Sequence, residues 1–243
     1  FFSGAGGLDL GFEKAGFNIA WANEFDKDIW ETFEKNFPNT NLDRRSIVDV
    51  LSDDIPDCDG IIGGPPCQSW SEAGTLKGIK DKRGQLFYEF IRILKDKQPK
   101  FFLAENVSGM LAQRHSEALE YIKKLFIDCG YVLSFKLLNA SDFDVPQVRK
   151  RVFFIGYRKD LKKEFKFPPS TGSKLTLKDA IYDINGSALI AKLKNHSNHD
   201  DCVLHNHEYI HGSYSTIYLS RNRVRMWNEP SFTIQAGGRH API

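Results

Sequence analysis

The alternation of short apolar segments with segments of helical spacing constrains the fold of this chain more than any other feature. The strand-like segments, rich in β-forming residues, are Asn18–Phe25, Gly60–Gly64, Lys100–Glu105, Val132–Asn139 and Arg151–Arg158. The helical segments are Leu8–Ala15, Gln85–Lys97 and Ser116–Cys129, the second of which has apolar residues at i, i+3, i+4 and i+7. Near-continuous apolar strands between amphipathic helices predict an α/β, doubly wound domain with a mostly parallel sheet covered on both faces.

The amino-acid composition of the chain changes near Phe167-Pro168-Pro169. Beyond a last predicted helix at Leu177–Ile184, Asn, His, Ser and Gly become frequent, and the apolar runs are short. We therefore predict a first domain over residues 1–184 and a second, smaller domain over residues 185–243. The second domain is expected to be irregular or β-rich, and incomplete at its C-terminal end.

The amino-acid composition limits the cellular environment and the binding partners that this chain is expected to have. The 243 residues contain no apolar run of membrane-spanning length, and the four cysteines are far apart with no CxxC pair, which favours a reducing cytoplasm and neither a disulfide framework nor a metal site. The net charge of +2 hides an asymmetry, since residues 1–60 carry 5 Lys and Arg against 13 Asp and Glu. The remaining residues are basic, which suits either a polyanion partner or ordinary surface variation.

A glycine-rich turn opens the chain between a strand end and a helix. Glycines in Phe2-Ser3-Gly4-Ala5-Gly6-Gly7-Leu8 allow a ligand to approach backbone N–H groups at the helix N-terminus. Glu24 ends the next strand, where nucleotide-binding α/β folds place a carboxylate for ribose hydroxyls. The order is not GxGxxG, so a nucleoside without a pyrophosphate, such as S-adenosylmethionine, fits as well as a dinucleotide or better. A tight turn that merely needs glycine is the structural alternative.

Three further motifs follow predicted strand ends. Gly63-Gly64-Pro65-Pro66-Cys67-Gln68-Ser69 presents a cysteine among turn-forming and polar residues, which favours a nucleophile over a buried core thiol. Glu105-Asn106-Val107 places a partly desolvated carboxyl at a strand end, suited to proton donation. Gln147-Val148-Arg149-Lys150-Arg151 is either a solvated basic turn or a pair of arginines directed at an anion.

Together and in this order, the four motifs resemble those of the cytosine-5 DNA methyltransferases, whose FxGxGG loop, Pro-Cys loop, Glu-Asn-Val strand end and QxRxR segment they match over residues 1–158. The segments GGPPCQSWS, FFLAENVSGM and SYSTIYLSRNRVRMWNEPSFTIQA are most similar to the HaeIII-type, GGCC-specific restriction-modification enzymes. One departure is Arg45-Ser46-Ile47, where the family usually has Gly-Asp-Ile. The late Arg-Arg-Leu-Thr and Gly-Asn-Ala-Val/Pro segments of the family are not found.

The resemblance implies a Rossmann-like methyltransferase fold with a smaller DNA-recognition domain, S-adenosylmethionine as cofactor, double-stranded DNA as partner, and a restriction endonuclease in the same system. The implied catalytic residues are Cys67, Glu105, Arg149 and Arg151. The implied cofactor-binding residues are Phe2, Ser3, Gly4, Ala5, Gly6, Gly7, Leu8, Asn23, Glu24, Ile47, Gly64, Pro66 and Leu86. The implied DNA-binding residues are Gln68, Ser69, Ser71, Arg221, Arg223, Arg225 and Arg239.

The resemblance also implies a reaction. The Cys67 thiolate adds to carbon 6 of a flipped-out cytosine, so that carbon 5 can take the methyl group. Arg221, Arg223 and Arg239 align with guanine-reading arginines, which predicts GGCC with methylation of the inner cytosine; Arg225 is expected to contact phosphate or to be structural. Three alternatives stay open: a DNA-binding fragment that does not turn over, a transfer-RNA cytosine-5 methyltransferase, and a nicotinamide-dependent oxidoreductase.

Overall fold

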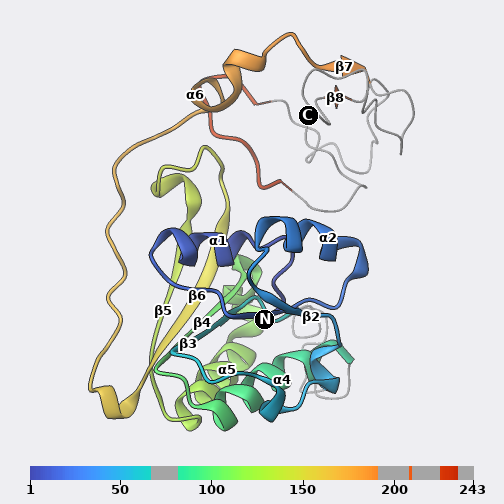
Figure 1. The fold of residues 1–243 in the computed structure, drawn as a ribbon. Helices are drawn as coiled ribbons and strands as arrows, with labels where there is room; N and C mark the ends of the chain where they lie inside the picture. Colours follow the sequence, from blue (N-terminus) through green and yellow to red (C-terminus); the bar gives the residue numbers. More distant parts are fainter. Residues whose placement is uncertain (67–81, 191–207, 210–224, 235–243) are drawn as a thin grey trace. The chain divides into compact units, whose positions relative to one another are not determined.

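The computed structural model describes residues 1–66, 82–190, 208–209 and 225–234 of the chain (Figure 1). These residues form two compact units. The first comprises Phe1–Leu138 and Arg151–Pro168, and the second comprises Asn139–Lys150 and Pro169–Ile243. The division of the chain into domains at residues 184 and 185 stays a prediction.

The first unit contains two groups of strands. In one, β1 (Trp21–Asn23) pairs in parallel with β2 (Asn41–Asp43). The other is a four-stranded sheet of order β3-β4-β6-β5, formed by Gly60–Gly63, Phe101–Val107, Lys150–Arg158 and Tyr131–Asn139 in that order. β3 and β4 are parallel, whereas β6 runs antiparallel to β4. Of the pairings described in the first unit, β1–β2 and β3–β4 are parallel and β4–β6 is antiparallel, and the predicted α/β class is confirmed.

Helices cover both faces of this sheet, as the apolar strands required. In Figure 1, α4 (Lys82–Lys97) and α5 (Ser116–Asp128) lie on one side, and α1 (Gly7–Lys14) and α2 (Lys27–Asn36) lie on the other. Three predicted helices agree with α1, α4 and α5 to within a few residues, whereas α2 was not predicted. It begins after Asp26, whose carboxylate accepts the N–H of Asp28 at 3.1 Å, a typical N-cap. Short 3₁₀ turns over Ile47–Asp49, Ser52–Asp54, Ser108–Leu111, Gln113–His115 and Lys159–Leu161 complete the connections.

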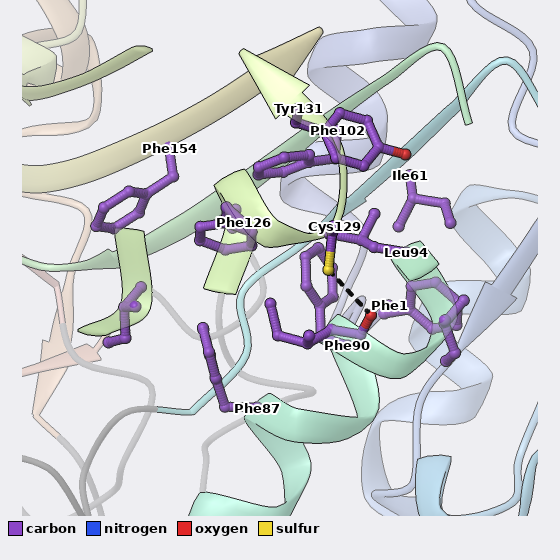
Figure 2. Packing of buried hydrophobic residues seen from close by; sticks show 14 of the residues in the cluster. Phe1, Ile61, Phe87, Phe90, Leu94, Phe102, Phe126, Cys129, Tyr131 and Phe154 are labelled. Carbon is purple, nitrogen blue, oxygen red and sulfur yellow. Dashed lines mark hydrogen bonds between the residues drawn. The ribbon is translucent and has the colours of Figure 1, made fainter. Parts of the chain in front are cut away.

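An aromatic core joins α4 and α5 to the sheet (Figure 2). Phe126 has no exposed surface and stacks on Phe102, with ring centroids 4.5 Å apart. Two polar groups inside this core have partners: the Cys129 thiol contacts the Ile91 carbonyl, and the Tyr131 hydroxyl donates to the Pro99 carbonyl at 2.9 Å. Burial raises the pKa of Tyr131 above its usual value of 10. Because all of these groups are packed or paired, this face of the sheet is a rigid scaffold.

Two glycines lie directly beneath aromatic rings of the neighbouring strand. Gly60 on β3 is paired with Phe101, and Gly156 on β6 is paired with Phe102. A methyl group on either glycine would lie 2.1 Å from the facing ring, well inside van der Waals contact. Both positions therefore require glycine, because the ring occupies the volume that a side chain would need.

The first residues of the chain lie between the two groups of strands. The Ser3 N–H donates to the Asn23 carbonyl at the end of β1, at 3.2 Å. On the other side, a methyl group at Gly63 of β3 would meet the Phe1 carbonyl at 2.6 Å. This contact brings the ends of β1 and β3 to the glycine-rich turn.

The second unit has little regular structure among its described residues. Its one longer element is α6 (Leu177–Ile181), which begins at a capping box made by Thr176 and Asp179 and continues into a 3₁₀ turn, Tyr182–Ile184. β7 (Leu189–Ile190) and β8 (Glu208–Tyr209) form a parallel pair, and the 3₁₀ turn Ala140–Asp142 follows β5. Across both units, none of the helices that the structure describes is long and apolar enough to cross a membrane.

Candidate active site

The glycine-rich turn adopts a conformation that requires glycine. Gly4 and Gly6 have φ of +57° and +87°, in the left-handed region, and a methyl group at Gly6 would lie 2.1 Å from the Phe37 ring. The Gly6 N–H bonds to the Ser3 carbonyl at 3.0 Å, and the Asn36 amide donates to the Ala5 carbonyl at 2.9 Å. The turn is thus fixed from within and by the end of α2.

Glu24 is bonded to this turn through its carboxylate. One oxygen accepts the N–H of Gly4 and the other accepts the N–H of Asp26, both at 2.8 Å. Its own carbonyl accepts the indole N–H of Trp30 at 2.7 Å. The sequence predicted that Glu24 meets a ligand; the structure gives the same carboxylate a second task, which is to hold the turn against the end of β1.

Asn23 and the segment that follows β2 form the next part of the site. Asn23 is buried, and its amide donates to the carbonyls of Asp43 and Arg45 at 3.1 and 2.8 Å. Arg45 bonds in turn to the carboxylates of Asp43 and Asp54. Ile47, which follows this segment, is buried in the core. Through these two hydrogen bonds, Asn23 holds the segment that leads to Ile47 against the carboxyl end of β1.

The glycine-rich turn has open space beside its backbone and a buried hydroxyl that a ligand could bond. Nothing lies within 4 Å of a methyl group built on Gly4 or on Gly7, so the space above both residues is open. The Ser3 hydroxyl is buried, and no hydrogen-bond partner for it exists among the described residues. A polar group buried without a partner is costly, and a bound ligand with a polar end would satisfy it. The residues present therefore fit a nucleoside cofactor.

A second polar cluster lies at the carboxyl ends of β3 and β4. The Glu105 carboxylate pairs with the Arg151 guanidinium at 2.9 Å, and their side chains are 24% and 19% exposed. A methyl group on Gly64 would lie 3.6 Å from the same carboxylate. The structure thus brings together two of the predicted catalytic residues and the start of the cysteine loop.

Asn106 holds that loop, a role the sequence reading missed. It is 7% exposed; its amide donates to the Pro65 carbonyl at 2.9 Å, and its side-chain oxygen accepts the Val107 N–H. A signal was present, because Phe102, Ala104 and Asn106 share the inward face of β4, where an asparagine needs a partner. Of the other predicted residues here, Leu86 on α4 packs against the core and Pro66 is half-buried.

Phe25 is a second residue that the sequence reading left without a role. It follows Glu24 at the end of β1, and 70% of its surface is exposed. A large exposed ring beside the Glu24 carboxylate is a surface on which a planar group can stack.

Several predicted residues lie outside the described residues or in the second unit. Cys67, Gln68, Ser69, Ser71, Arg221, Arg223 and Arg239 are among the residues that the structure does not describe. Arg149 belongs to the second unit, where its carbonyl accepts the Ala140 N–H at 2.9 Å. Arg225 pairs with Glu229 at 3.1 Å and lies 3.9 Å above the Phe232 ring. The expectation that Arg225 contacts phosphate or is structural stays a prediction.

A cavity of about 310 Å³ lies elsewhere in the first unit. Its lining includes Phe17–Trp21, Ile55–Ile62 and Phe101, at the amino ends of β1, β3 and β4. Ligands of α/β sheets bind at the carboxyl ends of the strands, where Glu24 and Glu105 lie, so we do not assign the reaction to this cavity. Within the described ranges, no group of His, Cys, Asp and Glu could hold a metal ion.

Comparison with solved structures relates this geometry to known folds. A crystal structure of a DNA modification methyltransferase encoded within an E. coli prophage is 33% identical, with a TM-score of 0.68, over 81% of this chain and 57% of that one. The structure of DNMT2 from Spodoptera frugiperda is 26% identical, with a TM-score of 0.61, over 73% of this chain and 56% of that one. The Rossmann-like methyltransferase fold is therefore confirmed.

Comparison of sequences identifies the family. Residues 1–242 match the C-5 cytosine-specific DNA methylase family. The chain is 59% identical to the Type II methyltransferase M.FnuDI of Fusobacterium nucleatum, over all of this chain and 71% of that protein. It is 55% identical to the Type II methyltransferase M.NgoPII of Neisseria gonorrhoeae, over all of this chain and 72% of that protein. The chain belongs to the family of C-5 cytosine-specific DNA methylases, enzymes that use S-adenosylmethionine as methyl donor.

Proposed function

We propose that this protein methylates carbon 5 of a flipped-out cytosine in duplex DNA, at the inner cytosine of GGCC, through a covalent bond to Cys67. The observation that carries the proposal is the Glu105–Arg151 pair beside the start of the cysteine loop. Cys67 follows Pro65 by two residues, and the carbonyl of Pro65 is held by Asn106, the neighbour of Glu105. The hydrogen bond between Asn106 and Pro65 thus ties the start of the cysteine loop to the strand that carries Glu105.

The thiolate is needed because carbon 5 of cytosine is a weak nucleophile. Addition of the Cys67 sulfur to carbon 6 forms an S–C bond and moves the ring electrons toward carbon 5. Carbon 5 would then form a bond to the methyl group, whose bond to the sulfonium sulfur of the cofactor would break, leaving a neutral thioether. Loss of the carbon 5 proton to a base, with cleavage of the S–C bond, restores the aromatic ring and the free cysteine. The atom is stacked inside the duplex, so the base must leave the helix first.

Glu105 and Arg151 have complementary tasks on the extruded base. The Glu105 carboxyl binds the N3 and N4 edge of cytosine. In its protonated form it shares its proton with N3 as negative charge grows there, and it takes the proton back when the S–C bond breaks. Arg151, which already contacts that carboxylate at 2.9 Å, orients it and binds the base carbonyl together with Arg149. Preorganised charges of this kind stabilise the charge that develops in the transition state.

The residues of the glycine-rich turn would hold the cofactor. When bound, S-adenosylmethionine supplies an electrophilic methyl group on a positively charged sulfur. The Ser3 hydroxyl and the N–H groups of the turn suit the amino-acid end of the cofactor, Glu24 suits the ribose, and Phe25 and the Ile47 backbone suit the adenine. Gly64, Pro66 and Leu86 complete the predicted pocket on the side of the cysteine loop.

A trapping experiment tests the covalent step. A GGCC duplex with 5-fluorocytosine at the inner position cannot lose its carbon 5 substituent as a cation, so the S–C bond should persist after methyl transfer. We expect a denaturation-resistant adduct with the wild-type protein and none with Cys67→Ala. Cys58→Ala, which removes an exposed cysteine at the opposite end of β3, is the matched control and should form the adduct normally. An adduct with Cys67→Ala would contradict the mechanism.

The substrate and the sequence read are tested by methyl uptake. Tritiated methyl groups should enter a GGCC duplex, and neither a scrambled duplex nor transfer RNA should accept them at a comparable rate. Arg223→Ala should cost about 1–3 kcal/mol on GGCC and relax discrimination there, because arginine reads guanine through O6 and N7. An equal loss on cognate and scrambled duplexes would make Arg223 a phosphate contact. A partner endonuclease in the bacterial cytoplasm stays a prediction.

A further inference from the structure

The turn that follows Arg225 is closed by one carboxylate. Glu229 accepts the Arg225 guanidinium at 3.1 Å with one oxygen and the Met226 N–H at 3.1 Å with the other, and its own N–H donates to the Met226 carbonyl at 3.0 Å. The guanidinium also packs 3.9 Å above the Phe232 ring. Arg225 is thus held on two sides, and the turn has a single well-defined shape.

This turn is attached to the start of α6. The Leu177 N–H donates to the Glu229 carbonyl and the Lys178 N–H donates to the Trp227 carbonyl, both at 2.9 Å. The Trp227 ring meets Tyr182 edge to face, with centroids 5.2 Å apart. The N–H groups of a first helical turn have no partners within the helix, so these bonds satisfy α6 and fix the turn at once.

The residues after the turn pair with the loop that carries Arg149. The Ser231 N–H donates to the Pro146 carbonyl and the Val148 N–H donates to the Ser231 carbonyl, both at 2.8 Å. The Thr233 hydroxyl donates to the Val148 carbonyl at 2.7 Å. Both backbone groups of Val148 are therefore bonded to this segment, which we call the Ser231–Thr233 seam.

We propose that the Ser231–Thr233 seam is a positioning element that couples DNA recognition to catalysis. This inference rests on the proposed function. Arg223 precedes Arg225 by two residues in the chain, and Arg149 follows Val148 directly. One hydrogen-bonded segment thus connects the predicted guanine-reading arginines to a predicted catalytic arginine. Thr233 touches neither base nor cofactor in this scheme; it acts through the backbone of Val148.

The coupling has a physical reason. A flipped base is bound productively only when the catalytic groups and the recognised base pairs are in register, and misplacement by an ångström is enough to slow a reaction strongly. The seam holds the two segments in a fixed position relative to each other. When the guanines are bound, the backbone of Val148, directly before Arg149, is therefore also held in position. Loss of the seam should then lower kcat on the cognate site more than it weakens binding of DNA.

The test removes the Thr233 hydroxyl while keeping the shape of the side chain. In Thr233→Val, we expect kcat on a GGCC duplex to fall about 5- to 30-fold, which corresponds to a hydrogen bond of about 1–2 kcal/mol. KM for DNA and Kd for the cofactor should stay within twofold, and Thr233→Ser should restore kcat to within threefold. Thr40→Val is the matched control, because the Thr40 hydroxyl makes an equivalent 2.7 Å bond to the Ile19 carbonyl in the first unit.

A second measurement is independent of turnover. Hydrogen exchange at the Val148 amide, which is bonded to Ser231, should be faster in Thr233→Val and unchanged in Thr40→Val. An active wild type whose Thr233→Val variant keeps its kcat, or loses only DNA affinity, would overturn the seam as a coupling element. Failure of Thr233→Ser to rescue would overturn it as well. A wild-type protein that transfers no methyl group to any duplex would instead overturn the proposed function.

Discussion

Replacing Glu24 with glutamine should weaken cofactor binding by one to two orders of magnitude. The carboxylate holds two backbone N–H groups, those of Gly4 and Asp26, each at 2.8 Å. Glutamine offers one oxygen and one NH₂ group, so one of these N–H groups would face a donor. Hydrogen bonds to a charged group contribute about 1.5–3 kcal/mol. Since each 1.4 kcal/mol is tenfold, Kd for the cofactor should rise by a factor of about 10 to 150.

Isothermal titration with S-adenosylmethionine and with its demethylated product, S-adenosylhomocysteine, measures this change. Both ligands should lose affinity equally, because the turn and the ribose contact are common to them. Glu31→Gln is the control: Glu31 pairs with Lys35 on α2, where both side chains are more than 70% exposed, and such pairs contribute little. A Glu24→Gln variant whose Kd stays within twofold of the wild-type value would refute both the clamp on the turn and the ribose role.

Three further predictions concern stability. Phe126→Ala should lower the free energy of unfolding, measured in urea, by about 3–5 kcal/mol, because the ring is fully buried. The same change at exposed Phe25 should lower it by under about 0.5 kcal/mol. Equal urea midpoints for the two variants would contradict the packing described. Gly6→Ala should destabilise the glycine-rich turn by more than about 1 kcal/mol, from its positive φ and its clash with Phe37, and a thermal midpoint equal to wild type would exclude this strain. Burial raises the pKa of Tyr131, so its contribution is complete below pH 10 and is lost as the pH rises further; Tyr131→Phe should flatten that alkaline loss in denaturation curves.

The sequence predicted the first unit better than the second because its elements repeat a simple hydrophobic period. Helix α4 was visible from Phe87, Phe90, Ile91 and Leu94, and these residues are buried. Helix α2 was missed, since KDIWETFEKN is charged and contributes one fully buried residue, Phe33. Its start was nevertheless encoded, as an aspartate in the N-cap position.

The second unit is assembled from segments that are far apart in the sequence. Residues 139–150 interrupt the run between β5 and β6, yet they cluster with residues 169–243. Their bonds to Thr171 and Ser231 join positions far apart in the chain, and no local period records such pairs. The order of the motifs indicated the candidate site. The inward position of Asn106 on β4 was also readable from the sequence, but the groups that it bonds, the Pro65 carbonyl and the Val107 N–H, became apparent only from the structure.

The glycines beneath the rings of Phe101 and Phe102 have a consequence for how this family can vary. A strand advances about 3.3 Å per residue, so a slip of β4 by one position would carry Glu105 out of the 2.9 Å contact with Arg151. Such a slip would also move the rings of Phe101 and Phe102 off the glycines that they cover on β3 and β6. Substitutions at these glycines should be tolerated only together with a smaller residue in place of the facing phenylalanine, as compensating pairs, and the alignment of the Glu105 carboxylate thus depends on positions that carry no side chain at all.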